Sequence, residues 1–514
     1  MTVLDSATPP GLDVIGERTL PMLLAEQAAQ FGERAFIVHE SLAGKVSELS
    51  FAGLHRQARG YAAALRARGI GPGSRVFVFL RNTPDFVPLW FGILYAGAVI
   101  VPANIYLTVH ELAPLLELGD PALIVSEAMF LDLVGEAAAG AAAAPIVVTD
   151  EAAGAERLVP ATEADVALPP VTSRDLAEIL FTSGTSSRPK GVMLTHANLL
   201  WSGLSADDLR ADDRFFNNKP LFHANCQSTV LNCLSVGATV ILGERYSATR
   251  YIAQLIRHDV TVCSLSGMLC RTLLNQPPSA DDARHKVRVA RYAINISEDE
   301  IEGFTRRFGM RPRNGYGLSE AMLSVASEPR GGPSLYPSIG RPAIGREVFL
   351  VNDDNRPVPP GETGEIVVRG VPGRTLMLGY FRDPAASEAA FAGGWLHTGD
   401  LARADPHGNL YFVGRKKDVI KRAGENISAG EVEEVLVGHP AISDAAVIGV
   451  PDPVRDQAIK AFVVVGDAQT DEESIRDHCR AHLAYFKVPE FIVFLDELPR
   501  NASGKLMKRD LEVM

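Results

Sequence analysis

The chain has 514 residues, of which 46% are hydrophobic and 22% are charged, and its formal net charge is −12. This length is too great for a single hydrophobic core, so we expect at least two domains. The negative net charge argues against general binding to nucleic acid or to anionic membranes, although a local site for an anion remains compatible with it. The five cysteines include no Cys-x-x-Cys pair, which predicts buried reduced thiols rather than zinc sites or disulfides.

Neither a signal peptide nor a membrane span is expected. Residues 1–18 lack a basic segment followed by an apolar one, as a signal peptide would require. The most hydrophobic window, Phe86 to Pro102, is interrupted by Pro88, Gly92 and Gly97 and is short for a membrane span. We expect a buried helix followed by a buried strand there, in a cytoplasmic protein.

Helical and strand patterns alternate from about Leu20 to Gly243. This alternation favours an α/β fold of doubly wound parallel sheets covered by helices. Leu54 to Arg68 has helical spacing, and the segment from Gly135 to Pro170 is rich in Ala, Glu and Pro, which predicts a surface connection. Short apolar runs predict strands at Val76–Leu80, Leu123–Val125, Ile146–Val148 and Thr239–Leu242.

The pattern changes after Val348. Short strands separated by Gly, Pro, Asn and Asp turns predict a small antiparallel or barrel-like unit up to Val413. A helix at Gly430–Leu436 and strands at Ala445–Val450 and Lys460–Val465 then predict a compact α+β domain. We therefore expect a large N-terminal domain, 1–414, and a small C-terminal domain, 415–514.

The segment from Phe181 to Gly191 reads Phe-Thr-Ser-Gly-Thr-Ser-Ser-Arg-Pro-Lys-Gly and directly follows a short apolar run. Such a loop offers backbone N–H groups, hydroxyls and one cation to a polyphosphate. It is not a Walker-A loop, because Pro189 precedes Lys190. Taken alone, it fits a flexible polar connection equally well.

Three further segments carry groups suited to a nucleotide. In Asn314–Glu320, Tyr316 could stack on a base and Glu320 could hold a magnesium ion, although an ordinary turn also fits. In Gly394–Asp400, the carboxylate of Asp400 suits a ribose diol, with Arg415 as the other half of a clamp. In Asn501–Lys505, the lysine is a point charge that could enter a cleft or remain solvated.

Together and in this order, these segments resemble the adenylate-forming superfamily of acyl-CoA synthetases, adenylation domains and firefly luciferase. The resemblance extends from about Leu20 to Leu511. Two segments, Tyr292–Ser297 and Ile420–Asn426, most resemble crotonobetaine/carnitine-CoA ligases. The resemblance implies an AMP-forming acid–CoA ligase, in which ATP and a carboxylic acid give an acyl-adenylate and pyrophosphate. The acyl group then passes to the thiol of CoA, and AMP leaves.

The resemblance also implies roles for residues of both predicted domains. Glu320 would hold Mg²⁺, with the hydroxyl of Ser319 nearby, and Tyr316 would stack on adenine. Lys505 would bridge the reacting carboxylate and the α-phosphate. The phosphate-binding residues would be Thr182, Ser183, Gly184, Thr185, Ser186 and Lys190, and the ribose would be held by Asp400 and Arg415.

The acyl pocket is less clearly marked. His223, in Pro220–His223, matches a pocket histidine of the superfamily, and it could otherwise be an ordinary core imidazole. Further pocket candidates are Asn225, Ser264, Gly315 and Leu318. The sequence does not identify the acid.

Thioester formation needs a different active site, which the resemblance attributes to rotation of a mobile C-terminal domain. Lys417 falls at the pivot position, and rotation would remove Lys505 from the cleft. Gly424 would then flank the pantetheine tunnel, where a side chain would block the thiol. The basic residues around Lys421 would attract CoA phosphates or form an ordinary solvated face.

Three positions depart from the common pattern of the superfamily. Thr185-Ser186-Ser187 stands where Thr-Thr-Gly is usual, Ala293–Ser297 is bulkier than usual, and Ser319 replaces threonine. These departures raise the hypothesis of an enzyme that mainly forms thioesters from a supplied acyl-adenylate.

The sequence leaves two more functions open. One is an adenylating enzyme that loads a carrier protein in trans, and the other is a catalytically quiet nucleotide-binding protein. Joint retention of Lys505, Glu320, Asp400 and Gly424 argues against the quiet protein, because nucleotide binding alone would not need Lys505 and Gly424.

Overall fold

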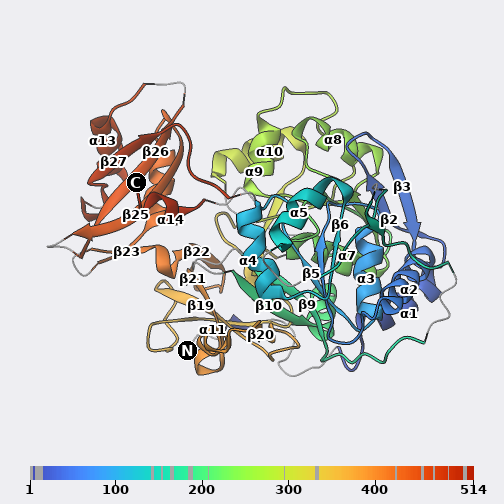
Figure 1. The fold of residues 1–514 in the computed structure, drawn as a ribbon. Coiled ribbons are helices and arrows are strands. Elements are labelled where there is room, and N and C mark those ends of the chain that lie inside the picture. Colours follow the sequence, from blue (N-terminus) through green and yellow to red (C-terminus); the bar gives the residue numbers. More distant parts are fainter. Residues whose placement is uncertain are drawn as a thin grey trace. The chain divides into compact units, whose positions relative to one another are not determined.

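The computed structural model divides the chain into two compact units (Figure 1). The larger unit comprises Leu4–Val348 and Val368–Leu396, and the smaller includes Phe349–Val367 and His397–Met514. The structure describes residues 4–5, 15–139, 144–151, 154–162, 167–182, 189–205, 208–293, 296–329, 335–422, 425–452, 456–466, 469–483, 485–501 and 506–514.

The larger unit contains an eight-stranded sheet in the order β20-β10-β9-β5-β4-β6-β7-β8. Its central strands pair in parallel, and β9, β10 and β20 pair antiparallel at one end. All residues of β5 and β6 are buried, as expected for strands covered on both faces. The strands are β20 (Gly379–Tyr380), β10 (Lys190–Thr195), β9 (Leu176–Thr182), β5 (Val99–Pro102), β4 (Arg75–Phe79), β6 (Leu123–Ser126), β7 (Ile146–Val148) and β8 (Glu156–Arg157).

A nine-stranded sheet in the order β17-β16-β15-β14-β13-β11-β12-β2-β3 completes this unit. The six strands from β15 to β2 run parallel, and the outer pairs are antiparallel. The strands are β17 (Arg341–Pro342), β16 (Leu323–Ser327), β15 (Pro312–Leu318), β14 (Val289–Tyr292), β13 (Val262–Ser264), β11 (Arg214–Asn217), β12 (Thr239–Gly243), β2 (Ala35–Glu40) and β3 (Val46–Ser50).

Helices alternate with these strands, as the sequence pattern predicted. The window from Phe86 to Pro102 forms a wholly buried helix, α3, and the buried strand β5, which confirms the expectation for it. In the part of the chain that the structure describes, no helix has the length and apolar character that crossing a bilayer requires. The helices of this unit are α1 (Leu20–Phe31), α2 (Phe51–Ala67), α3 (Phe86–Tyr95), α4 (Val109–Gly119), α5 (Leu131–Ala138), α6 (His196–Leu204), α7 (Ala224–Val236), α8 (Ala248–Arg257), α9 (Gly267–Leu274), α10 (Glu298–Phe308) and α11 (Pro384–Ala390).

One boundary differs from the sequence prediction. The surface connection was expected from Gly135, but residues up to Ala138 belong to α5. Val134 and Ala137 are buried on that helix, so apolar contacts outweigh the loop-like composition.

Helices α6 and α7 have well-defined ends, which matters because both line the candidate site. The hydroxyl of Thr195 caps α6 by accepting a hydrogen bond from the Asn198 backbone N–H at 3.2 Å. Helix α7 ends at Gly237, whose φ of 79° lies in the left-handed region. A Cβ at Gly237 would lie 2.2 Å from the Phe31 ring, so only glycine fits there.

The smaller unit contains most of one five-stranded sheet and all of another. The first has the order β1-β18-β19-β21-β22. Strands β21 and β22 pair antiparallel, which agrees with the antiparallel unit that the sequence predicted as one of two possibilities for this segment. The second has the order β24-β23-β26-β25, with β27 beside β26, and packs on α12 and α13 through a buried core around Val432, Val447 and Ile459. β1 (Leu4–Asp5) belongs to the larger unit. The other elements are β18 (Glu347–Val351), β19 (Thr363–Arg369), β21 (Leu396–Ala404), β22 (Leu410–Arg415), β23 (Val419–Arg422), β24 (Glu425–Ser428), β25 (Ile442–Asp452), β26 (Asp456–Val465), β27 (Phe491–Leu495), α12 (Ala429–Val437), α13 (Glu472–His482) and α14 (Lys508–Leu511).

Candidate active site

The candidate site lies at the carboxyl ends of parallel strands in the nine-stranded sheet. β11, β13 and β14 end at Asn217, Ser264 and Tyr292. Parallel neighbours bring these ends to one edge of the sheet, which is where open α/β sheets bind ligands. Segments that are far apart in the sequence therefore meet at this edge.

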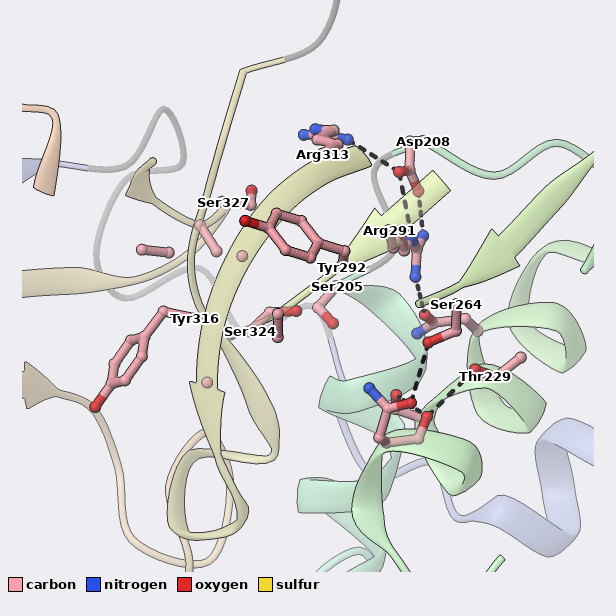
Figure 2. A pocket seen from close by; sticks show the side chains of 18 of the residues that line it. Ser205, Asp208, Thr229, Ser264, Arg291, Tyr292, Arg313, Tyr316, Ser324 and Ser327 are labelled. Atoms are coloured by element: carbon pink, nitrogen blue, oxygen red, sulfur yellow. Dashed lines mark hydrogen bonds and ion pairs between the residues drawn. The ribbon is translucent and has the colours of Figure 1, made fainter. Parts of the chain in front are cut away.

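A cavity of about 180 Å³ is lined by residues of α6, α7 and the strands β14 to β16 (Figure 2). We call it the polar cavity, because hydroxyl and amide side chains make up much of its wall. The hydroxyl of Ser202 is buried and has no hydrogen-bond partner among the described residues. The wall of the polar cavity includes Ser202, Asn225, Thr229, Ser264, Tyr316 and Ser324.

The Lys219 ammonium lies directly behind this wall. Its Nζ donates to the Ser264 hydroxyl at 2.9 Å and to the Leu265 carbonyl at 2.8 Å. The Ser264 hydroxyl in turn lies 3.2 Å from the Asn225 side-chain oxygen, to which it donates. Burial lowers the pKa of Lys219 to about 8, so the ammonium is mostly charged at neutral pH.

A second charged group lines the cavity around Asp208. The carboxylate accepts from Arg291 and, at 2.9 Å, from Arg313, as Figure 2 shows. Arg291 also donates to Asn232 at 2.9 Å and lies over the Phe215 ring. The two arginines are register neighbours on β14 and β15, so one carboxylate offsets the repulsion between two adjacent guanidinium groups.

Two predicted nucleotide-site residues of the larger unit meet at Tyr380. The Tyr380 hydroxyl donates to the Glu320 carboxylate at 2.9 Å, and the Lys190 ammonium lies 4.7 Å from the centre of the Tyr380 ring. β10 pairs with β20, which places Lys190 and Tyr380 on neighbouring strands. Burial, and then the Glu320 charge, raise the pKa of Tyr380, so its hydroxyl stays a donor.

Arg346 fixes the backbone next to Glu320. Its side chain is 1% exposed and donates to the carbonyls of Ala321, Thr375 and, at 3.0 Å, Ser324. The guanidinium also lies over the Trp201 ring. One buried cation thus binds three backbone carbonyls and holds the loop that carries Glu320.

The other predicted residues of the larger unit are placed as follows. Thr182 and Lys190 are register partners at the ends of β9 and β10, while Ser183, Gly184, Thr185 and Ser186 lie outside the described residues. Ser319 begins a short 3₁₀ turn directly after β15. Asn225, Gly315 and Tyr316 line the polar cavity, whereas His223 and Leu318 do not.

His223 precedes α7 and has an accessible side chain. Desolvation of the imidazole by the surrounding protein lowers the pKa of His223, and the positive charge of nearby Lys219 lowers it further. The imidazole is therefore mainly neutral at pH 7 and can accept a hydrogen bond. Its accessibility distinguishes it from an ordinary core imidazole.

In the smaller unit, the two residues predicted to hold the ribose lie together. Asp400 and Arg415 are register partners on β21 and β22, and Arg415 Nε lies 3.1 Å from the Asp400 carboxylate. Nearby Glu365 accepts from Lys416 at 3.1 Å and contacts His397 at 3.2 Å. Gly424 and Lys505 lie outside the described residues, as does the side chain of Lys417.

Sequence reasoning missed four residues that organise these clusters. Arg346 is buried and Lys219 is partly buried, but neither stands in an apolar run, because Asn218 precedes Lys219 and Glu347 follows Arg346, so no local pattern marks them. Tyr380 and Glu365 carry no motif that could have singled them out, because their partners lie far away in the sequence.

The residues present fit a magnesium ion that is bound mainly through a nucleotide. Among the described residues, no three His, Cys, Asp or Glu side chains gather as a metal site. Glu320 offers a single carboxylate, held by Tyr380. Magnesium typically takes one or two carboxylates and completes its shell with phosphate oxygens and water, which suits this donor set.

The comparisons with known proteins agree with the expected family and function. Residues 24–381 match the model of the AMP-binding enzyme family, and residues 431–505 match its C-terminal domain. A crotonobetaine/carnitine–CoA ligase of Salmonella arizonae is 39% identical over 98% of this chain and 100% of its own length.

Solved structures give the same result. An o-succinylbenzoate CoA synthetase from Bacillus subtilis, in complex with an acyl-adenylate intermediate, is 28% identical with a TM-score of 0.84, over 96% of this chain and 98% of that one. The same enzyme with ATP and a magnesium ion also has a TM-score of 0.84, at 28% identity over 96% of this chain and 99% of that one. The chain therefore belongs to the AMP-binding enzyme family, with the acyl-CoA ligases as its relatives.

Proposed function

We propose that the protein is an AMP-forming carboxylic acid–CoA ligase that uses ATP, Mg²⁺ and CoA. The single observation that carries the proposal is the meeting of Lys190, Tyr380 and Glu320. The sequence assigned Lys190 to the phosphates and Glu320 to the metal, and both side chains contact Tyr380. The family match, which spans most of the chain, supports the same function.

In the first step, the acid's carboxylate attacks the α-phosphate of ATP and pyrophosphate leaves. Two anions must approach, so cations have to offset their repulsion. Lys190 would interact with the β- and γ-phosphates, and Lys505 would bridge the two reacting groups. Glu320 would hold the magnesium ion, which supplies charge neutralisation when bound.

The base and the sugar would be held by residues of the two units. Tyr316 would stack on adenine. Asp400 and Arg415, which already form an ion pair, would hold the ribose hydroxyls. We keep the expected domains, 1–414 and 415–514, as part of the proposal, with Lys417 as the pivot between them.

In the second step, the CoA thiol attacks the acyl carbon and AMP leaves. We propose that the C-terminal domain rotates to exchange Lys505 for Gly424. Neutral His223, before α7, is the described residue that we assign to the acyl side of this step.

The relatives are acid–CoA ligases and support this interpretation. They do not favour a protein restricted to the thioester-forming half, or one that loads a carrier protein.

We also propose a cytoplasmic location, because all five cysteines are free buried thiols, which suits a reducing compartment. Fractionation of cells that express the protein would test the location.

The function is tested by incubating the protein with ATP, Mg²⁺, CoA and a panel of carboxylic acids. We expect equal amounts of AMP, pyrophosphate and acyl-CoA, and production of ADP in place of AMP would contradict the proposal. Glu320→Gln should abolish most of the activity, while Glu362→Gln, at an exposed carboxylate to which no role is assigned, should leave it intact.

A further inference from the structure

The charges around the polar cavity indicate which kind of acid it takes. Its described wall carries the carboxylate of Asp208 and the guanidinium groups of Arg291 and Arg313. Both oxygens of Asp208 accept from these arginines. The carboxylate is therefore engaged, and within the described wall no other carboxylate is present to receive a cationic ligand.

Lys219 adds a further positive charge directly behind this wall. Its ammonium has three N–H donors, and its acceptors among the described residues are two wall groups, the Ser264 hydroxyl and the Leu265 carbonyl. No carboxylate of the described chain forms an ion pair with it. The ammonium therefore lies behind two groups that line the cavity, and its third N–H has no acceptor among the described residues.

A buried ammonium without a counter-ion is costly in the empty protein, and an incoming anion would remove that cost. Cationic ligands would instead meet an ammonium and two guanidinium groups that share the single carboxylate of Asp208. The neighbouring hydroxyls, including the buried hydroxyl of Ser202, which lacks a partner among the described residues, suit the oxygen atoms of a polar ligand.

We propose that this ligase activates acids whose distal end carries a second carboxylate, and that Lys219 is the residue that selects them. The inference rests on the proposed function and deepens it by naming the substrate class. It separates this chain from its relatives, because carnitine and crotonobetaine both carry a trimethylammonium group where the proposed substrate carries an anion.

The test uses three acids that share one unsaturated backbone. They are glutaconate, its half-amide and crotonobetaine, whose distal ends are anionic, neutral and cationic. For each acid, the rate of pyrophosphate release is measured, together with the calorimetric affinity of the matching acyl-sulfamoyl adenosine, a stable analogue of the acyl-adenylate. We expect glutaconate and its analogue to be preferred by about ten- to a hundredfold over the other two.

Two variants tie the preference to the lysine. Lys219→Met should remove the preference for the anionic end and leave the half-amide almost unchanged, whereas Lys219→Arg should retain part of it. Lys45→Met, at an exposed lysine, is the matched control and should change nothing. The circular dichroism and melting temperature of each variant show whether it is folded.

Preference for crotonobetaine, or an equal loss for all three acids in Lys219→Met, would overturn the inference. An equal loss would mean that Lys219 acts on a part that all three acids share. If the analogues bind in the expected order but no acid releases pyrophosphate, the proposed function fails while the inference about the cavity stands.

Discussion

The hydrogen bond from Tyr380 to Glu320 is the contact on which the metal-binding role depends most directly. Tyr380→Phe removes the donor and leaves the ring beside Lys190. A hydrogen bond to a charged group contributes about 1.5–3 kcal/mol. We therefore expect pyrophosphate release to slow by about tenfold or more, with a higher magnesium concentration needed for half-maximal rate.

Titration with magnesium distinguishes this role from simple packing. If Tyr380→Phe slows the reaction but leaves its magnesium dependence unchanged, Tyr380 does not orient a metal-binding carboxylate. Tyr411→Phe, in the smaller unit, serves as a control because its hydroxyl contacts Asp405 on a turn.

Glu178 makes stability depend on pH. It is buried on β9 and accepts from Gln227 at 2.7 Å, and burial raises the pKa of Glu178 from 4.5 to about 8. Between these two values the folded protein holds a proton that the unfolded chain releases, so stability falls as pH rises through this window. The slope from this one group approaches about 1.4 kcal/mol per pH unit.

Glu178→Gln removes this ionisation and keeps a similar shape. We expect the variant to lose the Glu178 contribution to the slope. Between pH 5 and pH 8 the variant should therefore lose less unfolding free energy than the parent protein does. Urea denaturation at several pH values measures the difference. An unchanged slope would contradict the assignment of a neutral buried carboxyl to Glu178.

Residue-level roles could be predicted from the sequence only where a motif carried them. Gly315 lies in the motif Asn314–Glu320 and lines the polar cavity, as does Asn225 just after Pro220–His223, while their roles stay predictions. Lys219 and Tyr380 have partners that are distant in sequence, so no local pattern could indicate their contacts. Nothing in the sequence indicates that two register-paired arginines share one carboxylate.

At the scale of elements, α7 depends on the glycine that ends it. Gly237 and Gly69 have nearly the same left-handed φ, 79° and 78°, but a Cβ would clash with Phe31 only at Gly237. Gly69→Ala should therefore cost about 1 kcal/mol of unfolding free energy from backbone strain alone. Gly237→Ala should cost about 3 kcal/mol, because the clash adds to the strain.

Chemical denaturation of the two variants tests this comparison. Equal losses would show that the Phe31 ring moves aside and that packing does not fix the end of α7. In addition, a shifted α7 should weaken acyl-analogue binding in Gly237→Ala and not in Gly69→Ala, because only α7 carries Asn225 and Thr229.

Most elements were predictable because apolar runs and turn residues are local signals. The strands at Val76, Leu123 and Thr239 and the helix from Leu54 agree with the structure within a few residues. The prediction was wrong at Gly135–Ala138, where tertiary burial of Ala137 overrode composition. Short strands such as β20 and β17 have no sequence signal, since neighbouring strands alone define them.

In the whole molecule, domain alternation requires that single substitutions can impair one half-reaction and spare the other. Lys505→Ala should reduce pyrophosphate release by about a hundredfold or more, because it removes a cation from the reacting oxygens. It should leave thioester formation from a supplied acyl-adenylate almost unchanged. Gly424→Leu should do the reverse, since a side chain there would obstruct the thiol.

Rapid-quench measurements of each half-reaction check this separation. Parallel losses in both half-reactions for either variant would contradict domain alternation.

The fold class was predictable from alternating elements, but the two-unit division was harder to foresee. The smaller unit includes Phe349–Val367, which is discontinuous with the rest of it in sequence.

The central claim is that the acid's carboxylate oxygen becomes bonded to the α-phosphorus of ATP. Heavy oxygen placed in the carboxylate of an accepted acid tests it directly, with mass spectrometry of the products after turnover with ATP and CoA. We predict one labelled oxygen in AMP and none in pyrophosphate. Unlabelled AMP, or label in any other phosphate product, would contradict the account.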